Sequence, residues 1–181
     1  MCAKLLILES PGKVKKVQSF LGPDWKVVAS VGHVRDLPVK EMGVAAPDFK
    51  PHYQPTERGA DVLKRLGALA KQADVVYLAT DPDREGEAIA WHVADALKLK
   101  DAKRVTYGEI TESAVKAAVQ SPRAIDMALV AAQEGRRVLD RFCGYLVSGP
   151  LSRAVGTRLS AGRVQSPALR LVVERERAIT S

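Results

Sequence analysis

The sequence of 181 residues predicts an α/β fold, a parallel sheet flanked by helices, followed by an all-helical segment. Leu5–Leu8 and Asp74–Ala79 are short, nearly continuous apolar runs, which is the pattern of strands buried on both faces of a sheet. Helical patterns separate the predicted strands, and strands that alternate with helices form a parallel sheet. After residue 123 the strand runs stop. We therefore expect a boundary there, with one domain at 1–123 and a helical part at 124–181.

Periodicity and capping residues predict the other elements. Further strands are expected at 25–30 and 103–106. Thr56 and Thr111 are suitable N-caps, and helices are expected at about 11–20, 57–72, 85–97 and 111–119. The proline-rich stretch 39–55 is predicted to be an irregular surface loop.

Two helical patterns make up the rest of the chain. The first, 125–147, has an apolar stripe, and Ser148–Pro150 is expected to break or kink it. A loop at 159–167 leads into the last helix. The predicted stripe contains Ile125, Leu129, Ala132 and Leu139.

Composition limits the partners. With 28 Lys+Arg against 21 Asp+Glu the formal charge is +7, which favours a polyanion such as nucleic acid. Cys2 and Cys143 are too few and too far apart for a disulfide scaffold or a zinc ribbon. There is neither a signal-peptide pattern nor an apolar run long enough to span a membrane. We expect a cytoplasmic protein that does not bind membranes.

Acidic residues stand where the strand at 74–79 meets the next helix. Asp81, Asp83 and Glu85 would repel one another unless a cation or the helix N-terminus compensates them. Mg²⁺ suits such a site because it takes one or two carboxylates, keeps waters and shares substrate phosphates. The alternative is a solvated acidic loop that only caps the helix.

Another acidic residue, Glu9, is expected near this cluster. Glu9 follows the predicted strand Leu5–Leu8 directly. Because ligands bind outside the carboxyl ends of parallel strands, Glu9 and Asp81 can lie close together. Ser10 is a reasonable N-cap and Pro11 a favoured first helical residue. Lys13, one turn into that helix, could reach a phosphate.

A flank of the helix at 125–147 carries Gln133, Arg136, Arg137, Asp140 and Arg141. Arginine suits bidentate phosphate contacts, and an acidic residue among guanidinium groups can orient them. A salt-bridged, solvated surface is the alternative. Small residues at 160–162, followed by Arg163 and Gln165, would let a nucleic-acid backbone approach closely.

Longer motifs narrow these possibilities. Glu9-Ser10-Pro11-Gly12-Lys13 and the stretch from Asp81 to His92 resemble the Toprim domain of type IA DNA topoisomerases, the family of bacterial topoisomerase I. The segments 133–141 and 160–165 are similar to the DNA-binding helix and loop of the same family, which implies that 124–181 is the first part of its helical DNA-binding domain. Ser30 to His33 matches a family segment that contacts the DNA strand.

The resemblance implies relaxation of negatively supercoiled DNA by transient single-strand cleavage and religation. Glu9 would act as general acid or base and Lys13 would stabilise the phosphate. Mg²⁺ would be held by Asp81 and Asp83, with Glu85 and Glu9 as further candidates. Single-stranded DNA would be bound by His33, Arg84, Arg136, Arg137, Asp140, Arg141, Tyr145, Ser160, Ala161, Gly162, Arg163, Val164 and Gln165.

One family feature is missing from this sequence. The nucleophilic tyrosine of the family lies in a Tyr-x-Arg-Thr context, and none of Tyr53, Tyr77, Tyr107 or Tyr145 has Arg two positions later. We therefore expect an amino-terminal fragment, inactive alone, whose partners include the remaining gate domains. A Toprim nuclease or primase-like enzyme and a non-catalytic single-stranded-DNA-binding module remain as alternatives.

Overall fold

The computed structural model describes residues 4–180. The chain divides into two compact units. We call Met1–Leu37 with Tyr53–Gln133 the sheet unit, and Pro38–His52 with Glu134–Ser181 the helical unit. The domain boundary expected at residue 123 stays a prediction. Cys143 is a free thiol, and Cys2 lies outside the described residues.

A four-stranded sheet forms the centre of the sheet unit. Its strand order is β2-β1-β7-β8 and every neighbouring pair is parallel, which confirms the predicted parallel sheet. Leu8, the last residue of β1, is paired with Ala79, the last residue of β7. The strands are β1 (Lys4–Leu8), β2 (Trp25–Ala29), β7 (Val75–Ala79) and β8 (Lys103–Arg104).

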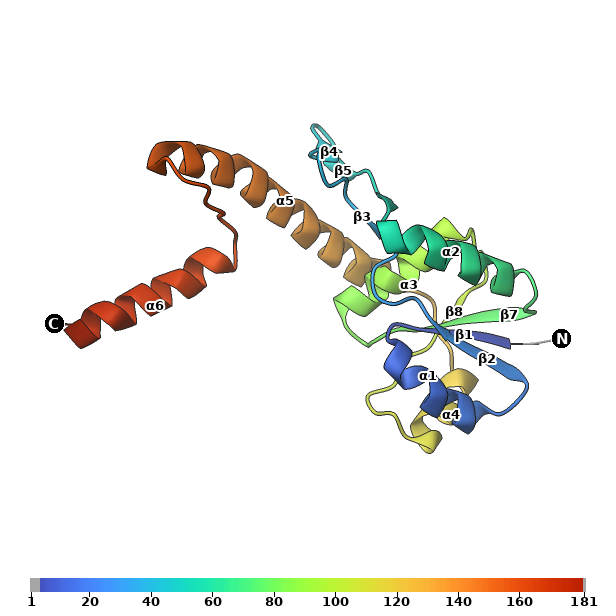
Figure 1. Ribbon diagram of the computed structural model, residues 1–181. Helices are drawn as coiled ribbons and strands as arrows, with labels where there is room; N and C mark the ends of the chain where they lie inside the picture. Colours follow the sequence, from blue (N-terminus) through green and yellow to red (C-terminus); the bar gives the residue numbers. More distant parts are fainter. Residues whose placement is uncertain (1–3, 181) are drawn as a thin grey trace. The chain divides into compact units, whose positions relative to one another are not determined.

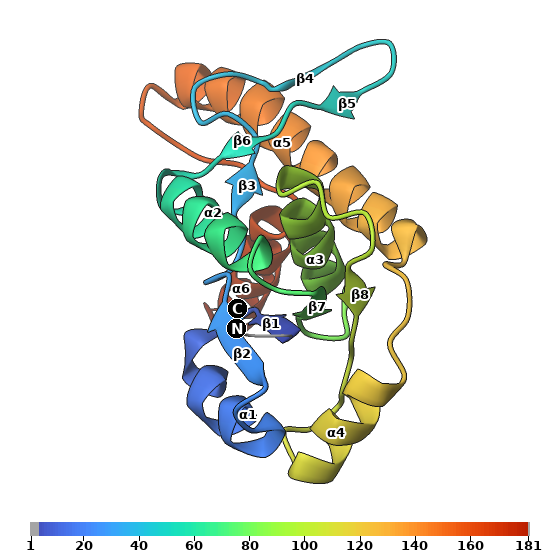
Figure 2. The same ribbon diagram turned by 90° about the vertical axis from the view of Figure 1, so that its right-hand side faces the viewer.

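Helices cover both faces of this sheet (Figures 1 and 2). Because side chains alternate along a strand, Leu5 and Ile7 pack in one apolar cluster with residues of α2 and α3, whereas Leu6 and Leu8 pack in another with residues of α1 and α4. The helices are α1 (Val14–Leu21), α2 (Glu57–Ala70), α3 (Arg84–Ala96) and α4 (Glu112–Gln120), and a short 3₁₀ helix, η1 (Pro11–Lys13), precedes α1.

The predicted N-caps Thr56 and Thr111 explain where two helices begin. Thr56 Oγ1 accepts a hydrogen bond from the Gly59 amide at 3.0 Å, and Thr111 Oγ1 accepts one from the Ala114 amide at 3.4 Å. Asp83 caps α3 in the same way. Ser10 occupies the N-cap position of η1, but its side chain makes no capping bond.

The stretch 39–55 is more ordered than predicted, since it contains short antiparallel pairs. In the sheet unit, β3 (Arg35–Asp36) pairs with β6 (Gln54–Pro55). In the helical unit, β4 (Val44–Ala45) pairs with β5 (Lys50–Pro51). These strands are two residues long, so proline can occupy a place that a long central strand would forbid.

Helix α5 (Met127–Val155) begins in the sheet unit and continues into the helical unit. Of the predicted break or kink at Ser148–Pro150, the break is wrong, because Pro150 lies inside this helix, and the kink stays a prediction. A proline removes one backbone hydrogen bond of a helix, and the remaining bonds of a 29-residue helix hold it together. Helix α6 (Gln165–Thr180) follows.

The predicted apolar stripe is only partly covered: Ile125 packs against the core of the sheet unit and Leu129 is half-buried. Ala132 and Leu139 are exposed, whereas Val130, Gln133 and Arg141 are buried. Tertiary hydrogen bonds to Gln133 and Arg141, described below, decide which side of the helix is covered.

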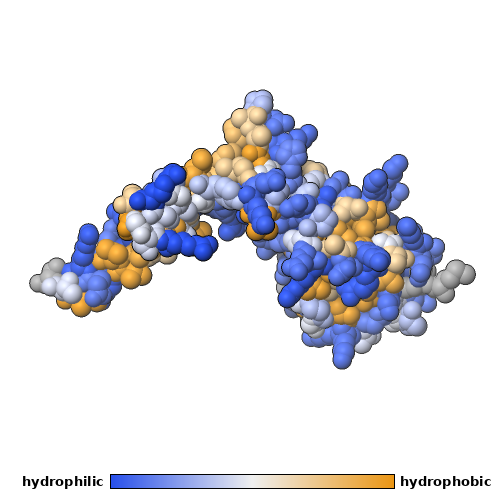
Figure 3. Space-filling model, turned by 45° about the horizontal axis from the view of Figure 1, so that its top comes forward, coloured by the Kyte–Doolittle hydropathy of each residue, from blue (hydrophilic) through white to orange (hydrophobic). Residues whose placement is uncertain are grey.

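Exposed hydrophobic side chains gather on α6 (Figure 3). Among residues 4–180, no helix has both the length and the apolar character needed to cross a membrane. The exposed residues of α6 include Leu169, Leu171, Val172 and Ile179.

Candidate functional site

The carboxyl ends of β1 and β7 lie side by side and carry the acidic residues singled out by the sequence. Lys13 Nζ lies 2.7 Å from Asp81 Oδ1, so the motif at 9–13 does meet the motif at 81–87. The main-chain oxygen of Glu9 accepts hydrogen bonds from the amides of Val31 and Gly32, at 3.0 and 3.3 Å. This turn, in which Val31 and Gly32 have positive φ angles, brings the segment before His33 to the end of β1.

The loop after β7 is held tightly against the first turn of α3. Asp83 Oδ1 accepts from the Gly86 amide at 2.7 Å, and Thr80 Oγ1 donates to the Gly86 oxygen at 2.6 Å. A Cβ atom at Gly86 would collide with the main-chain oxygen of Asp81. Glycine is therefore required here for the helix to approach the loop.

Glu85 connects the acidic loop with two other predicted site residues. His33 Nε2 lies 3.4 Å from Glu85 Oε2, and Gln133 Nε2 donates to the same oxygen at 3.3 Å. Gln133 is buried, and its Oε1 atom has no hydrogen-bond partner among the described residues. The structure thus brings together His33, Glu85 and Gln133, which are distant in sequence.

The donor atoms at this edge are compatible with Mg²⁺. Asp81 and Asp83 offer carboxylate oxygens, and one oxygen of each is engaged, with Lys13 and with the Gly86 amide respectively. Among residues 4–180 no group of three or more His, Cys, Asp and Glu side chains is arranged to hold a metal ion. Mg²⁺ needs only one or two carboxylates beside water and phosphate oxygens. The ligand assignment to Glu9, Asp81, Asp83 and Glu85 stays a prediction.

A pocket of about 410 Å³ adjoins Asp81. Lys13, Lys16, Tyr107 and Glu109 contribute polar groups to its wall. Burial, helped by the charge of Asp81, raises the pKa of Tyr107 to about 12. Arg84 is exposed in the first turn of α3.

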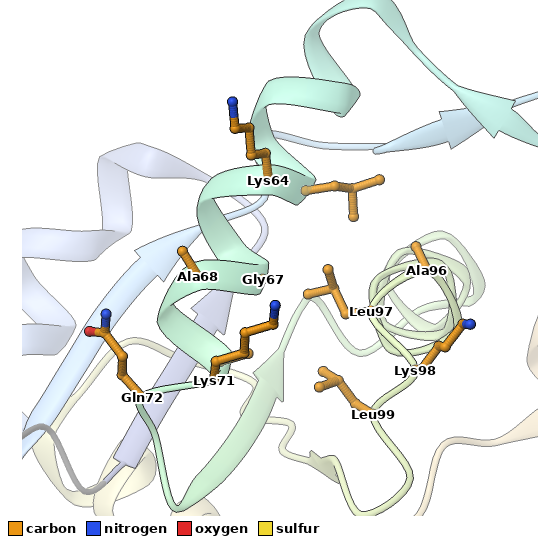
Figure 4. A pocket seen from close by; sticks show the side chains of 11 residues that line it. Lys64, Gly67, Ala68, Lys71, Gln72, Ala96, Leu97, Lys98 and Leu99 are labelled. Carbon is orange, nitrogen blue, oxygen red and sulfur yellow. The ribbon is translucent and has the colours of Figure 1, made fainter.

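A larger pocket, of about 760 Å³, lies between the C-terminal ends of α2 and α3 (Figure 4). Leu97 and Leu99 form part of its wall, together with Lys71 and Lys98. Because these helices lead into β7 and β8, the pocket is at the amino edge of the sheet, opposite the acidic loop. Cations at the C-terminal ends of helices stabilise the helix dipole, which accounts for the two lysines.

Sequence reasoning missed a buried ionic cluster in the sheet unit. Glu87, Arg104 and Arg123 form it, and the side chains of Glu87 and Arg104 are 0% exposed. Burial by itself would raise the pKa of Glu87, but hydrogen bonds from Arg123 and the Asp126 amide and the charge of Arg104 hold it below its usual range. The available signal was an arginine, Arg104, within a predicted strand.

In the helical unit, Arg141 and Tyr145 hold the segment 38–41. Arg141 Nη1 donates to the oxygens of Pro38 and Glu41, at 2.8 and 3.2 Å, and the Tyr145 hydroxyl donates to the Val39 oxygen at 2.9 Å. Arg141 is 8% exposed. The structure therefore gives both residues a structural task, and the predicted DNA contacts of Arg141 and Tyr145 stay untested.

Asp140 of α5 connects this helix with the loop before α6. Arg163 Nε lies 2.9 Å and Arg136 Nε 3.8 Å from its carboxylate. Sequence reasoning overlooked two serines of α5: Ser148 bonds both main-chain groups of Ala161, and Ser152 those of Leu159.

The other predicted contacts lie in α5 or in the loop before α6. Ser160 Oγ donates to Gln165 Oε1 at 3.4 Å. Arg137 lies one turn before Arg141 in α5, while Gly162, Arg163 and Val164 precede the first residue of α6, Gln165.

Comparison with known proteins defines the class. Residues 4–112 match the Toprim domain, and the chain belongs to this family. Residues 124–181 match the family described as DNA topoisomerase. The chain thus combines a Toprim domain with a segment of a bacterial-type topoisomerase.

Individual relatives agree with this classification. The chain is 68% identical over 176 residues to a plasmid DNA topoisomerase I of Xylella fastidiosa, strain 9a5c. It is also similar to full-length topoisomerase I of Thermotoga maritima, with a TM-score of 0.84 and 44% identity. The matches cover 97% and 96% of this chain, and the chain spans 27% and 30% of the lengths of those two proteins.

Proposed function

We propose that the chain is the Mg²⁺-binding and DNA-binding portion of a type IA DNA topoisomerase that relaxes negatively supercoiled DNA by transient single-strand cleavage and religation. The meeting of Lys13 with Asp81 at the carboxyl edge of the sheet carries this proposal, because it joins the two motifs of the acidic site. The matches to Toprim and DNA topoisomerase families support it.

The acidic edge would position the scissile phosphate. Asp81 and Asp83 would hold Mg²⁺, with Glu85 and Glu9 as additional oxygen donors, and Glu9 would act as general acid or base. Bound Mg²⁺ supplies charge stabilisation at a phosphate oxygen. Lys13 offsets the charge of Asp81 and would also stabilise negative charge on the phosphate.

DNA would be bound chiefly as a single strand. His33 and Arg84 would contact it from the sheet unit, and Arg136, Arg137, Arg141 and Arg163 from the helical unit. Asp140 would orient the guanidinium groups through the ion pairs described above. The polar and small residues at 160–165 would let the backbone approach closely. Four phosphate contacts imply a slope of log K against log salt of roughly −3.

A Toprim nuclease or primase needs the carboxylates but no tyrosine. The match of residues 124–181 to DNA topoisomerase favours the topoisomerase instead. The same match makes bacterial cytoplasm, close to the nucleoid, the expected location, and the gate domains of the family the expected partners.

A chimaera tests the proposal directly. This chain would replace the matching 176 residues of the Xylella fastidiosa topoisomerase, which is 68% identical to it. We expect the chimaera to relax negatively supercoiled plasmid in the presence of Mg²⁺, and the chain alone to leave the topoisomer ladder unchanged. Asp81→Asn with Asp83→Asn should abolish relaxation by the chimaera.

The exposed Asp101 in the loop before β8 provides a matched control. Asp101→Asn removes a carboxylate at the opposite edge of the sheet and should leave relaxation unchanged. A chimaera that folds but cleaves plasmid without religation would favour the nuclease reading. Full activity of the double Asp variant would overturn the metal assignment.

A further inference from the structure

Arg104 is the largest fully buried side chain of the described residues, and its guanidinium group donates hydrogen bonds in several directions. Nη1 donates to the main-chain oxygens of Leu78 (3.2 Å), Thr80 (2.9 Å) and Val105 (2.6 Å). Nη2 donates to the main-chain oxygen of Asp81 at 2.8 Å. Nε donates to Glu87 Oε2 at 2.9 Å.

Three of these acceptors belong to the segment where β7 becomes the acidic loop. The neighbouring strand β8 is only two residues long, with Leu78 paired to Arg104, so the sheet cannot bind the later carbonyl groups. Buried carbonyl groups need a donor. The side chain of Arg104 supplies the missing donors, because it donates hydrogen bonds to the carbonyl oxygens of Thr80 and Asp81.

Glu87 holds the guanidinium group in place. Its carboxylate also accepts both Nη atoms of Arg123 at 2.8 Å and the Asp126 amide at 2.7 Å. Glu87 lies on α3, four residues after Asp83, whose oxygen accepts its amide hydrogen bond. The acidic loop is therefore tied to α3 through its own backbone and through the Glu87–Arg104 pair.

We propose that Arg104 is a positioning residue of the Mg²⁺ site: it fixes the backbone of Asp81, and Glu87 fixes Arg104. This inference rests on the proposed function of Asp81 and Asp83 as ligands. Each of the three guanidinium nitrogens of Arg104 donates to a protein oxygen, so we assign this residue to the support of the loop and not to contact with the ion or the phosphate.

Only arginine has the shape for this task. Its planar group presents five donors in a rigid fork, whereas lysine presents three donors on a single nitrogen. A lysine at 104 can keep its charge beside Glu87 but cannot span the oxygens of Thr80 and Asp81 together.

The experiment compares Arg104→Met with Arg123→Met in this chain. Both variants remove a guanidinium partner of Glu87, but only Arg104 touches the acidic loop, since Arg123 otherwise donates to the Ala124 oxygen. Mg²⁺ is titrated while the amide shifts of residues 80–87 are followed. Outer-shell partners of metal ligands typically contribute 10–100-fold in affinity. We expect at least about tenfold weaker Mg²⁺ binding for Arg104→Met and less than about threefold for Arg123→Met.

Arg104→Lys separates charge from geometry. It should weaken Mg²⁺ binding nearly as much as Arg104→Met, because the fork is lost while the charge remains. Wild-type affinity in Arg104→Lys, or equal weakening in Arg104→Met and Arg123→Met, would overturn the inference.

Hydrogen exchange without metal gives a second readout. In Arg104→Met the amides of residues 80–86 should exchange faster, while those of β1 and the middle of β7 keep their wild-type rates; Arg123→Met should leave the loop rates unchanged. Uniform acceleration throughout the sheet unit would mean a merely structural role. If wild type binds no Mg²⁺, the proposed metal site fails, and exchange still decides whether Arg104 orders the loop.

If the Arg104 variants do not fold, a measurement on the wild type tests the inference instead. The Nε–H signal of Arg104 should shift during the Mg²⁺ titration with the same midpoint as the amides of residues 80–87. The Nε–H signal of Arg123 is the internal control. An Arg104 signal that does not respond while the loop amides do would contradict the inference.

Discussion

The two units contain similar ionic clusters in opposite surroundings. In the sheet unit Glu87 lies between Arg104 and Arg123, and in the helical unit Asp140 lies between Arg136 and Arg163. The side chain of Glu87 is 0% exposed and that of Asp140 is 35% exposed. Each cluster consists of one carboxylate and two guanidinium groups, so their difference comes from burial.

Burial determines what each cluster can do. A buried charge that loses its partner is strongly destabilising, so the Glu87 cluster has to stay closed and can hold a backbone in place. An exposed ion pair is weak, so a phosphate can compete for the arginines around Asp140. The Glu87 cluster is therefore suited to hold the backbone of a site in place, and the Asp140 cluster is suited to bind a polyanion.

Loss of the buried carboxylate should have the largest effect. Glu87→Ala leaves Arg104 buried without its anionic partner, and we expect the free energy of unfolding to fall by about 3–5 kcal/mol. Urea denaturation measures it. The matched control, Asp140→Ala, should cost less than about 1 kcal/mol. Equal costs would remove the distinction between the clusters.

The buried His92 should make the stability of the sheet unit depend on pH. Burial, followed by the charges of Arg35 and His33, lowers the pKa of His92 to about 3, although Asp95 and Asp36 oppose the shift. The unfolded chain, with a pKa of 6.5, binds the proton first, so stability is complete above pH 6.5 and declines as pH falls toward 3. The slope should approach about 1.4 kcal/mol per pH unit.

Denaturation at several pH values measures this slope. His92→Asn should flatten it, because asparagine can still accept a hydrogen bond from Arg35 but does not titrate. His52 is exposed in the helical unit, and His52→Gln should keep the wild-type slope. A slope unaffected by His92→Asn would disprove the assignment.

The exposed cluster should govern the salt dependence of DNA binding. Arg136→Gln with Arg163→Gln should flatten the slope of log K against log salt by about 1.4, because each phosphate contact on a single strand contributes about −0.7. Fluorescence anisotropy of a labelled single-stranded oligonucleotide measures it. Arg170→Gln with Arg177→Gln, on α6 outside the predicted contact set, is the control. An unchanged slope in the Arg136 and Arg163 variant would place the DNA elsewhere.

The smallest effect is expected at Tyr145. Tyr145→Phe removes the hydrogen bond to the Val39 oxygen and the longer one, of 3.3 Å, that the hydroxyl accepts from Arg141; because Arg141 keeps its carbonyl acceptors, the cost should be about 0.5–1.5 kcal/mol. Chemical denaturation measures the stability, and anisotropy on the same variant measures DNA binding. A loss of DNA affinity without loss of stability would assign Tyr145 to the DNA rather than to the segment 38–41.

Local chemistry made much of the fold predictable. The apolar runs at β1 and β7, the threonine caps of α2 and α4 and the acidic start of α3 are properties of neighbouring residues, and the structure agrees with all of them. The edge shared by Glu9 and Asp81 was also predictable, because the carboxyl ends of parallel strands meet at one edge.

What the sequence by itself determined is therefore the parallel sheet, its acidic edge and the helical character of the second part. Only the tertiary structure decided that α5 buries Gln133 and Arg141 while Ala132 and Leu139 of its apolar stripe are exposed, and that Arg104 binds the carbonyls of the acidic loop. Periodicity shows which residues are apolar, whereas the N–H groups of these buried polar side chains donate to carboxylates and carbonyl groups that are distant in the sequence. Such partners are up to 103 residues apart in the chain, and only folding brings them together.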